Sequence, residues 1–136
     1  MQIIIFQLGS EQYGIETSKV QSIDKIKDIT KVPCAPDYIK GLINLRGSIV
    51  TVYDPYVLLG IENKDRNIEN ILIIEVNDEQ IGMLVDKVIE VVEIDNAMVK
   101  DVSASKGDAK SYIKGTIKME DFLVTLIDIN ELLNAE

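Results

Sequence analysis

The 136-residue chain contains no histidine, no tryptophan and only one cysteine, Cys34. The lack of histidine removes the usual general base, the commonest metal ligand and the residue that histidine kinases phosphorylate. One cysteine cannot form an internal disulfide, and no histidine is present to activate its thiol. Glycine-rich phosphate loops, paired cysteines for zinc and serine nucleophiles with suitable partners are missing as well. We therefore expect a protein that is not an enzyme, with no catalytic, cofactor-binding or metal-binding residues.

Positive charge and long apolar runs are also scarce. The chain has 14 Lys and Arg against 23 Asp and Glu, a formal net charge of -9, and its cations are scattered along the sequence. Such a surface repels phosphates, which argues against nucleic-acid binding. No apolar run approaches the roughly 18 residues of a membrane helix, and the N-terminal MQIIIFQL lacks a basic leader and a cleavage site. We expect a cytoplasmic protein without direct membrane insertion.

The most informative feature that is present is an internal repeat. Residues 38–59 align without gaps with residues 112–133, both beginning with YIKG, and ten of the 22 positions are identical. Residues 3–23 align with residues 71–91 and share Glu-Gln-x-Gly and Lys-Val. One structural unit has thus been built twice, in a chain long enough for one compact domain. We expect a single domain over 1–136, with a first barrel over about 1–65 and a second over about 66–136.

The first part of each repeat predicts a β-hairpin. Residues 2–8 and 71–76 are apolar and β-branched, as buried strands are, and each is followed by a pair of residues that tolerates positive φ. The turns are Gly9-Ser10 and Asn77-Asp78, and the partner strands are 11–16 and 79–85. Gly14 and Gly82 lie inside those strands, where glycine usually marks a bulge or a sharp bend.

The second part of each repeat predicts another hairpin followed by a short helix. The hairpin tips are Arg46-Gly47 and Glu120-Asp121, and the YIKG glycine allows the chain to bend into the next strand. Asp54 and Asp128 follow, and we interpret them as repeated helix caps rather than catalytic carboxylates. The final helix is expected at about 128–134. Residues 61–70 predict a polar surface connection, and residues 95–111 an irregular excursion.

These elements together predict a mainly β fold of about ten short strands in two sets of five, with short helices. Turn signals every eight to twelve residues favour two small barrels, closed or nearly closed. Positions where one copy departs from the other are the most informative about binding, because the shared fold explains whatever both copies keep. The clearest is the hairpin tip, which is cationic in the first copy and doubly anionic in the second.

The strand before the first tip has an outer face that suits protein docking. Ile43 and Leu45 alternate with Leu42 and Asn44, so the first pair is expected in the core and the second pair outside. This outer face carries less charge than its counterpart in the second copy. An apolar face beside Arg46 is typical of a protein-docking patch. Packing of the same face between the two halves is the alternative, and the sequence does not decide between them.

Two segments also resemble a known family. Pro33 to Asp54 follow P-x-x-P-x-Y-I-x-G-L-I-N-L-R-G-x-I-V-x-V-x-D, and Phe6 to Ile23 follow F-x-L-G-x-E-x-Y-G-I-x-x-x-K-V-Q-x-I. Both resemble segments of CheW, the bacterial chemotaxis coupling family, and the resemblance spans nearly the whole chain. It implies two five-stranded barrels that resemble SH3 domains. It also implies a scaffold that bridges the histidine kinase CheA, whose regulatory domain is similar to CheW, to the cytoplasmic tips of transmembrane methyl-accepting chemoreceptors.

The resemblance further implies which residues meet each partner. The receptor-docking residues that it implies are Val20, Ile23, Gly41, Asn44 and Arg46. Kinase docking is implied on the exposed strands of the first barrel, here at Leu42, with a second contact near Lys100. The protein would then be cytoplasmic and associated with membrane receptor arrays through these partners.

Other functions remain open at this point. The same fold serves equally well as a coupling module of a non-chemotactic kinase pathway, or as an excised kinase regulatory domain. From a different class, a small barrel is able to bind an oligonucleotide or a small ligand, for which aromatic residues on an exposed sheet face are the usual signal. The chain has only five Tyr and two Phe, and several of them lie at expected core positions.

Overall fold

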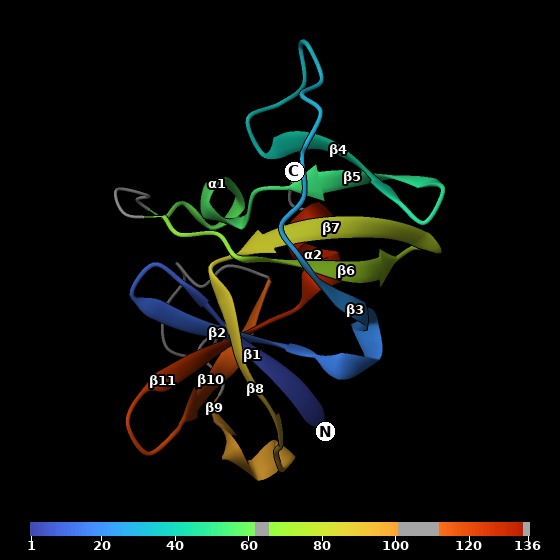
Figure 1. The fold of residues 1–136 in the computed structure, drawn as a ribbon. Helices are drawn as coiled ribbons and strands as arrows, with labels where there is room; N and C mark the ends of the chain where they lie inside the picture. The colour runs from blue at the N-terminus through green and yellow to red at the C-terminus, as the bar shows by residue number, and fades with distance from the viewer. Residues whose placement is uncertain (62–65, 101–111, 135–136) are drawn as a thin grey trace.

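The computed structural model describes residues 1–61, 66–100 and 112–134 and is mainly β. Its strands are β1 (Gln2–Leu8), β2 (Glu11–Glu16), β3 (Val20–Lys25), β4 (Ile39–Leu45), β5 (Ser48–Tyr53), β6 (Asn70–Val76), β7 (Glu79–Val85), β8 (Lys87–Glu93), β9 (Val99–Lys100), β10 (Ile113–Lys118) and β11 (Leu123–Ile127) (Figure 1). Its helices are α1 (Pro55–Leu59) and α2 (Ile129–Asn134), with 3-10 turns η1 (Thr17–Lys19) and η2 (Asn96–Met98). None of the helices in the described ranges is long and apolar enough to cross a membrane.

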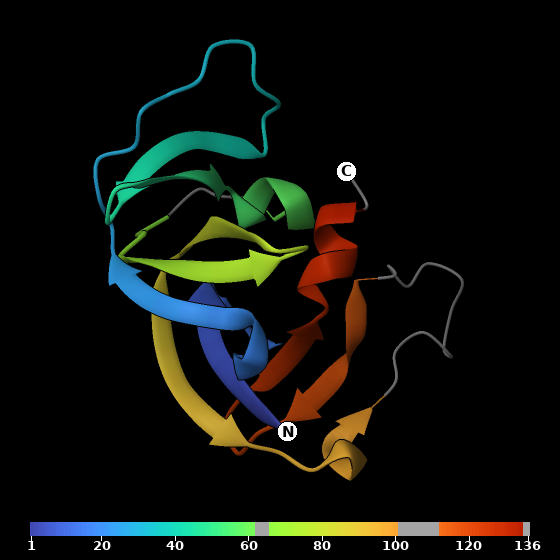
Figure 2. The same ribbon diagram turned by 90° about the vertical axis from the view of Figure 1, so that its right-hand side faces the viewer.

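The strands form two sheets that lie one above the other (Figures 1 and 2). The six-stranded sheet has the order β8-β1-β2-β11-β10-β9, and the five-stranded sheet has the order β3-β6-β7-β5-β4. Each sheet therefore takes strands from both halves of the chain, and the predicted division into barrels at residue 65 is wrong. The two repeats exchange their first hairpins: parallel pairings of β2 with β11 and of β7 with β5 attach each hairpin to the other repeat.

The repeated YIKG glycines are needed where the chain passes close to a neighbouring backbone. A Cβ atom on Gly41 would overlap the carbonyl oxygen of Thr30, and one on Gly115 would overlap the carbonyl oxygen of Lys100. Thr30 and Leu42 exchange two backbone hydrogen bonds, with N–O distances of 2.9 and 2.8 Å. Lys100 pairs in the same way with β10. Both copies therefore need glycine for close approach, in addition to the predicted change of strand direction.

The glycines inside β2 and β7 do not mark bulges, which is one of the two alternatives predicted for them. Gly14 and Gly82 lie in regular register with β1 and β6. A Cβ atom on Gly14 would lie 3.1 Å from Val124 Cγ1, and one on Gly82 would lie 3.1 Å from Ile71 Cγ2. These glycines therefore make room for side chains of neighbouring strands.

The turns and helix caps agree with the sequence. Positive φ angles are found at 64° for Gly9, at 51° and 65° for Asn77 and Asp78, and at 50° and 88° for the Arg46-Gly47 tip. The Tyr56 amide donates to Asp54 Oδ1, and the Asn130 amide donates to Asp128 Oδ1, each at 3.1 Å. The two aspartates are thus repeated N-caps, and α2 begins at Ile129, immediately after its cap.

Three hydrophobic clusters hold the molecule together. The largest lies between the sheets, with members such as Phe6 and Leu8 of β1 and Leu72 and Ile74 of β6, all fully buried. A second cluster is formed by side chains of the five-stranded sheet, and a third is formed mainly by side chains of the six-stranded sheet. The two sheets therefore share a hydrophobic interface.

The two predicted irregular segments are only partly described. Residues 95–100 contain the cap Asp95, η2 and β9, and residues 101–111 lie outside the described residues. Residues 61–70 do not all form a solvated surface connection, because only 15% of the Arg66 side chain is exposed. Its guanidinium donates to both carboxylate oxygens of Asp54, at 2.8 and 2.9 Å, and its carbon Cζ lies 4.2 Å from the centre of the Tyr56 ring.

Candidate docking surface

The β4–β5 hairpin shows the predicted alternation. Ile43 and Leu45 are 3% exposed and belong to the cluster inside the five-stranded sheet, whereas Asn44 is exposed and Leu42 is half-buried. Ile49 lies opposite Asn44 on β5, with 66% of its surface exposed. The outer face of this hairpin therefore does not pack between the two halves, and it is free to meet another molecule.

Arg46 is positioned at the tip by its neighbours. The Gly47 amide donates to Asn44 Oδ1 at 3.0 Å, which makes the Asn44 side chain part of the turn itself. Arg46 Nη2 lies 3.8 Å from Asp24 Oδ1 on β3, and 68% of the Arg46 side chain is exposed. A surface ion pair of this kind contributes little to stability, so the guanidinium is available to a partner.

The predicted receptor-docking residues differ in how far they are exposed. Ile23 is 41% exposed on β3, and Asn44 and Arg46 are exposed at the end of β4. Val20 packs partly against the core between the sheets. Gly41 is buried and contacts the 29–30 backbone and side chains. Ile23, Asn44 and Arg46 are thus accessible, whereas Val20 is only half-exposed and Gly41 is buried.

The two predicted kinase-docking residues are far apart in the fold. Leu42 lies on β4 of the five-stranded sheet, where its backbone pairs with Thr30. Lys100 is exposed on β9, at the edge of the six-stranded sheet. One partner would have to span both sheets, or make two separate contacts, to use both.

Sequence reasoning missed a pair of exposed apolar residues. Ile49 and Leu123 occupy equivalent positions of the repeat and are 66% and 54% exposed, the highest values among the large hydrophobic residues that the structure describes. An exposed apolar residue kept in both copies is not explained by the core. The alignment of the repeat contained this signal, because both residues follow a hairpin tip and point away from the inward-facing Val50 and Val124 next to them.

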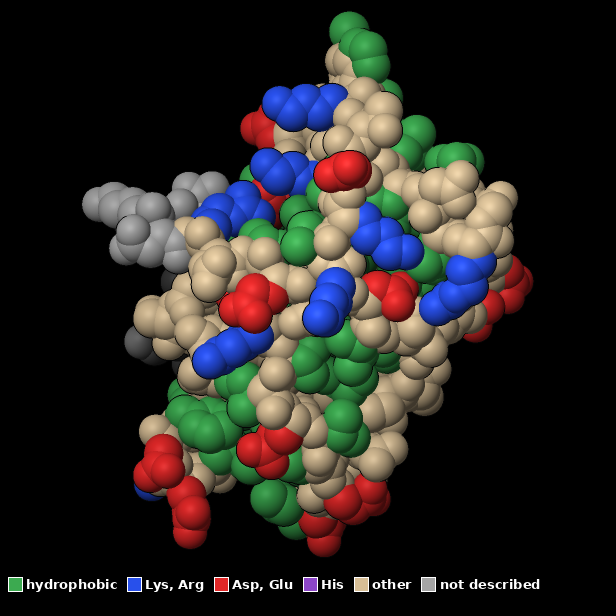
Figure 3. All heavy atoms as spheres, viewed as in Figure 1, with side chains coloured by type: hydrophobic (Ala, Val, Ile, Leu, Met, Phe, Trp, Pro, Cys, Tyr) green, Lys and Arg blue, Asp and Glu red, His purple; other side chains and the backbone are tan. Residues whose placement is uncertain are grey.

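Cations gather on one part of the surface, although they appear scattered along the sequence. Residues 17–53 contain six Lys and Arg and three Asp, whereas the rest of the chain contains eight Lys and Arg and 20 Asp and Glu. Figure 3 shows blue side chains in a band over β3 and the segment that rises from it, with mainly red and green below. Lys25 and Lys27 are exposed here on either side of Ile26, which is 42% exposed.

The ionisable groups of the interior serve the fold. Burial and the Asp86 carboxylate, which accepts a hydrogen bond of 2.6 Å from the Tyr56 hydroxyl, raise the pKa of Tyr56 to about 12. Burial also raises the pKa of Tyr13, whose hydroxyl donates to Glu11. A cluster of His, Cys, Asp or Glu able to hold a metal ion does not occur among the described residues.

Comparison with known proteins agrees with the two-sheet architecture. A family model described as "CheW-like domain" matches residues 2–136. The Chemotaxis protein CheW of Treponema pallidum is 28% identical, over 99% of this chain and 83% of its own length. That of Bacillus subtilis is 32% identical, over 98% of this chain and 87% of its own. The crystal structure of scaffolding protein TtCheW from Thermoanaerobacter tengcongensis superposes with a TM-score of 0.86 and 31% identity, over 96% of this chain and 86% of that one. The chain therefore belongs to the family of CheW-like domains.

Proposed function

We propose that this chain couples the cytoplasmic tips of methyl-accepting chemoreceptors to the regulatory domain of the histidine kinase CheA. CheW proteins are non-catalytic chemotaxis scaffolds, and the match to the family over residues 2–136 is the observation that carries the proposal. The partners are those that the family resemblance implies. The protein would lie in the cytoplasm and join membrane receptor arrays only through them, without nucleic acid.

The receptor would dock against the five-stranded sheet. Ile23 and Arg46 offer an apolar and a cationic group, and the Asp24–Arg46 ion pair brings the tip of the β4–β5 hairpin towards β3. Val20 and Gly41 support this surface, while Asn44 keeps the tip in shape. Burial of an apolar side chain beside an arginine is the usual centre of a protein interface.

The kinase would dock on the outer face of β4 and β5. Leu42 and the exposed Ile49 provide the apolar contact there, and Lys100 provides a second contact from the edge of the six-stranded sheet. The two patches meet on the β4–β5 hairpin, where Asn44 lies opposite Ile49, so each partner is able to influence the other through the scaffold, provided that both favour the same arrangement of the complex.

Co-purification tests the proposal directly. The full chain is mixed with a chemoreceptor tip fragment, a CheA regulatory fragment, or both, and the complexes are separated by size-exclusion chromatography. We expect two binary complexes and one ternary complex. Failure of both fragments to bind, under conditions in which a known CheW protein binds them, would rule out the chemotactic assignment. That result would favour one of the alternatives, first of all a coupling module of a different kinase pathway.

A further inference from the structure

A cleft of about 630 Å³ lies at one end of the six-stranded sheet, on the side where the chain begins. Its apolar lining comes from Met1, Val99 and Leu126, which belong to or pack against the cluster inside this sheet. Its polar lining includes Glu16 at the end of β2 and Lys114 on β10. The volume is within the range typical of small-molecule sites, about 300–1,000 Å³.

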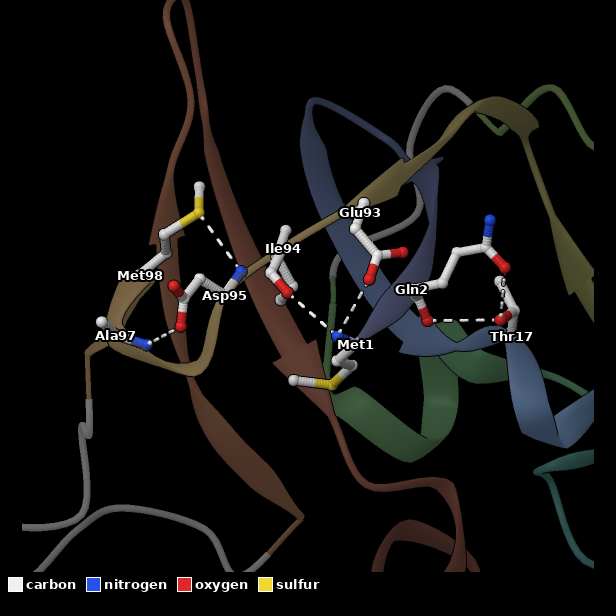
Figure 4. Close-up of polar contacts among 8 residues, drawn as sticks. All are labelled: Met1, Gln2, Thr17, Glu93, Ile94, Asp95, Ala97 and Met98. Carbon is white, nitrogen blue, oxygen red and sulfur yellow. Dashed lines mark hydrogen bonds and ion pairs between the residues drawn. The ribbon is translucent and has the colours of Figure 1, made fainter.

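The rims of the cleft are held by local hydrogen bonds, as Figure 4 shows for both sides. On one side, the Thr17 hydroxyl of η1 lies 3.3 Å from the carbonyl oxygen of Gln2 and 3.2 Å from its side-chain oxygen. On the other side, the Ala97 amide of η2 donates to Asp95 Oδ1 at 3.1 Å. Because both rims are fixed in the unliganded molecule, a ligand would not have to order them.

The internal repeat shows that this end of the sheet departs from its counterpart. Glu16 aligns with Leu84, which is 2% exposed and belongs to the core of the five-stranded sheet. Lys114 aligns with Lys40, and among the described residues Lys114 has a carboxylate partner, Glu16, whereas Lys40 has no salt bridge. Glu16 Oε1 accepts from Lys114 Nζ at 2.7 Å. The repeat therefore does not fix a charge at this position, and Glu16 is the group that an anionic ligand would have to displace from Lys114.

The hydrogen-bonding capacity of the pair identifies the ligand chemistry. An ammonium group has three N–H donors, and within the described residues Lys114 has one acceptor, Glu16. The second oxygen of Glu16 already lies 3.4 Å from the Ser18 hydroxyl. The Lys114 ammonium group therefore has N–H donors left over, and it lies next to the apolar lining of the cleft. A ligand with an anionic acceptor and an apolar chain would complement this arrangement.

We propose that this cleft binds a small amphipathic carboxylate. Its apolar part would lie against Val99, Leu126 and Met1, and its carboxylate would accept hydrogen bonds from Lys114 in competition with Glu16. This site is separate from the β4–β5 hairpin, so it would give the scaffold a small-molecule ligand in addition to its protein partners.

The test uses octanoate and the full chain labelled with nitrogen-15. Amide shifts are followed at 0.15 M salt, where repulsion by the net charge of -9 is screened beyond about 8 Å. We expect saturable shifts at residues 16–18, 96–99 and 114, and none with acetate or with 1-octanol at the same concentration. Shifts confined to the exposed Ile49 and Leu123 would instead show adsorption to apolar side chains and would overturn the proposal.

Two substitutions at the pair should act in opposite directions. Lys114→Met should weaken octanoate binding about 10-fold or more, since a hydrogen bond to a charged group is lost. Glu16→Gln should strengthen it about threefold or more, because the competing carboxylate is gone. Lys118→Met, on the same strand β10, is the matched control and should leave the affinity unchanged. Equal affinities for all four proteins, or weaker binding by Glu16→Gln, would contradict the assignment.

Discussion

The β4–β5 and β10–β11 hairpins are two copies of one structure that present opposite charges. Each has a buried inner row, an aspartate cap after it and an exposed apolar residue just past the tip, Ile49 or Leu123. The tip residues are Arg46-Gly47 in one and Glu120-Asp121 in the other. The scaffold has therefore been kept twice while the chemistry at its tips has diverged.

This comparison separates residues that the fold requires from residues that a partner requires. Identical residues such as Gly41 and Gly115 meet the same steric demand in both copies. Residues that differ at accessible positions face no such demand, and they are where we place the contacts with other proteins. Each prediction below compares equivalent positions of the two copies.

The largest effect is expected from the YIKG glycines. Gly41→Ala places a methyl group on the Thr30 carbonyl oxygen and should cost more than about 4 kcal/mol of unfolding free energy in urea titrations. Gly115→Ala should cost as much, because Lys100 provides the same obstacle. Gly47→Ala, at a φ of 88° with nothing within 4 Å, should cost only about 1–2 kcal/mol. Gly115 is not at a positive φ, so a loss for Gly115→Ala no larger than that for Gly47→Ala would show that the clash does not set the requirement.

These glycines also show how far the sequence predicts the fold. The repeat, the turn residues and the alternation in each strand predict the strands, the positive φ positions and the aspartate caps. They do not predict the exchange of hairpins. The first hairpins of the two repeats have the same pattern of apolar and polar residues, so the pattern does not show to which repeat each hairpin attaches. The actual partner depends on contacts such as Val124 against Gly14, which join residues far apart in the chain.

The same limit applies to the candidate site. Family resemblance and alternation were enough to predict the outward position of Asn44 and the exposure of Arg46. Neither predicts that Gly41 is buried against the backbone of Thr30. Neither predicts that Arg66, in a polar segment, pairs with the capping Asp54, which lies 12 residues earlier. Both features depend on tertiary contacts that leave no local pattern.

The two capping aspartates should differ in their contribution to stability. Asp54→Ala removes a cap and also leaves the largely buried Arg66 guanidinium without its carboxylate, which should cost about 3 kcal/mol. Asp128→Ala removes a cap alone and should cost about 1 kcal/mol. In the Arg66→Met background, the cost of Asp54→Ala should fall towards that of Asp128→Ala. If it does not, the ion pair is not the source of the difference.

Of the two exposed apolar residues, only Ile49 is expected to contribute to kinase binding. Ile49→Asp should weaken binding of a CheA regulatory fragment about 30-fold, as expected for a central interface residue, with little change in thermal stability. Leu123→Asp should leave the same binary complex within about twofold. Isothermal titration calorimetry with both variants measures this directly. Equal weakening by both would mean that the two hairpins are used interchangeably.

A smaller effect is expected at the tip itself. Arg46→Ala should weaken binding of a chemoreceptor tip fragment about fivefold without unfolding the domain, because its side chain is 68% exposed and contributes little to the core. Glu120→Ala, at the equivalent tip, is the control and should bind as the parent does. If Arg46→Ala binds receptor and kinase fragments as tightly as the parent, the docking surface has been placed on the wrong hairpin.

The smallest effect concerns the Glu16–Lys114 pair and its dependence on pH. The hydrogen bond from Lys114 lowers the pKa of Glu16 below its ordinary value, although burial opposes the shift. A carboxyl whose pKa is lower in the folded state stabilises the fold above its unfolded pKa, and this contribution disappears as the pH falls through the folded pKa. The difference in unfolding free energy between the parent and Lys114→Met should therefore be constant near neutral pH and shrink below about pH 4.5. Lys40→Met, at the position that aligns with Lys114, should show no such decline, because the residue that aligns with Glu16 is Leu84, which does not titrate.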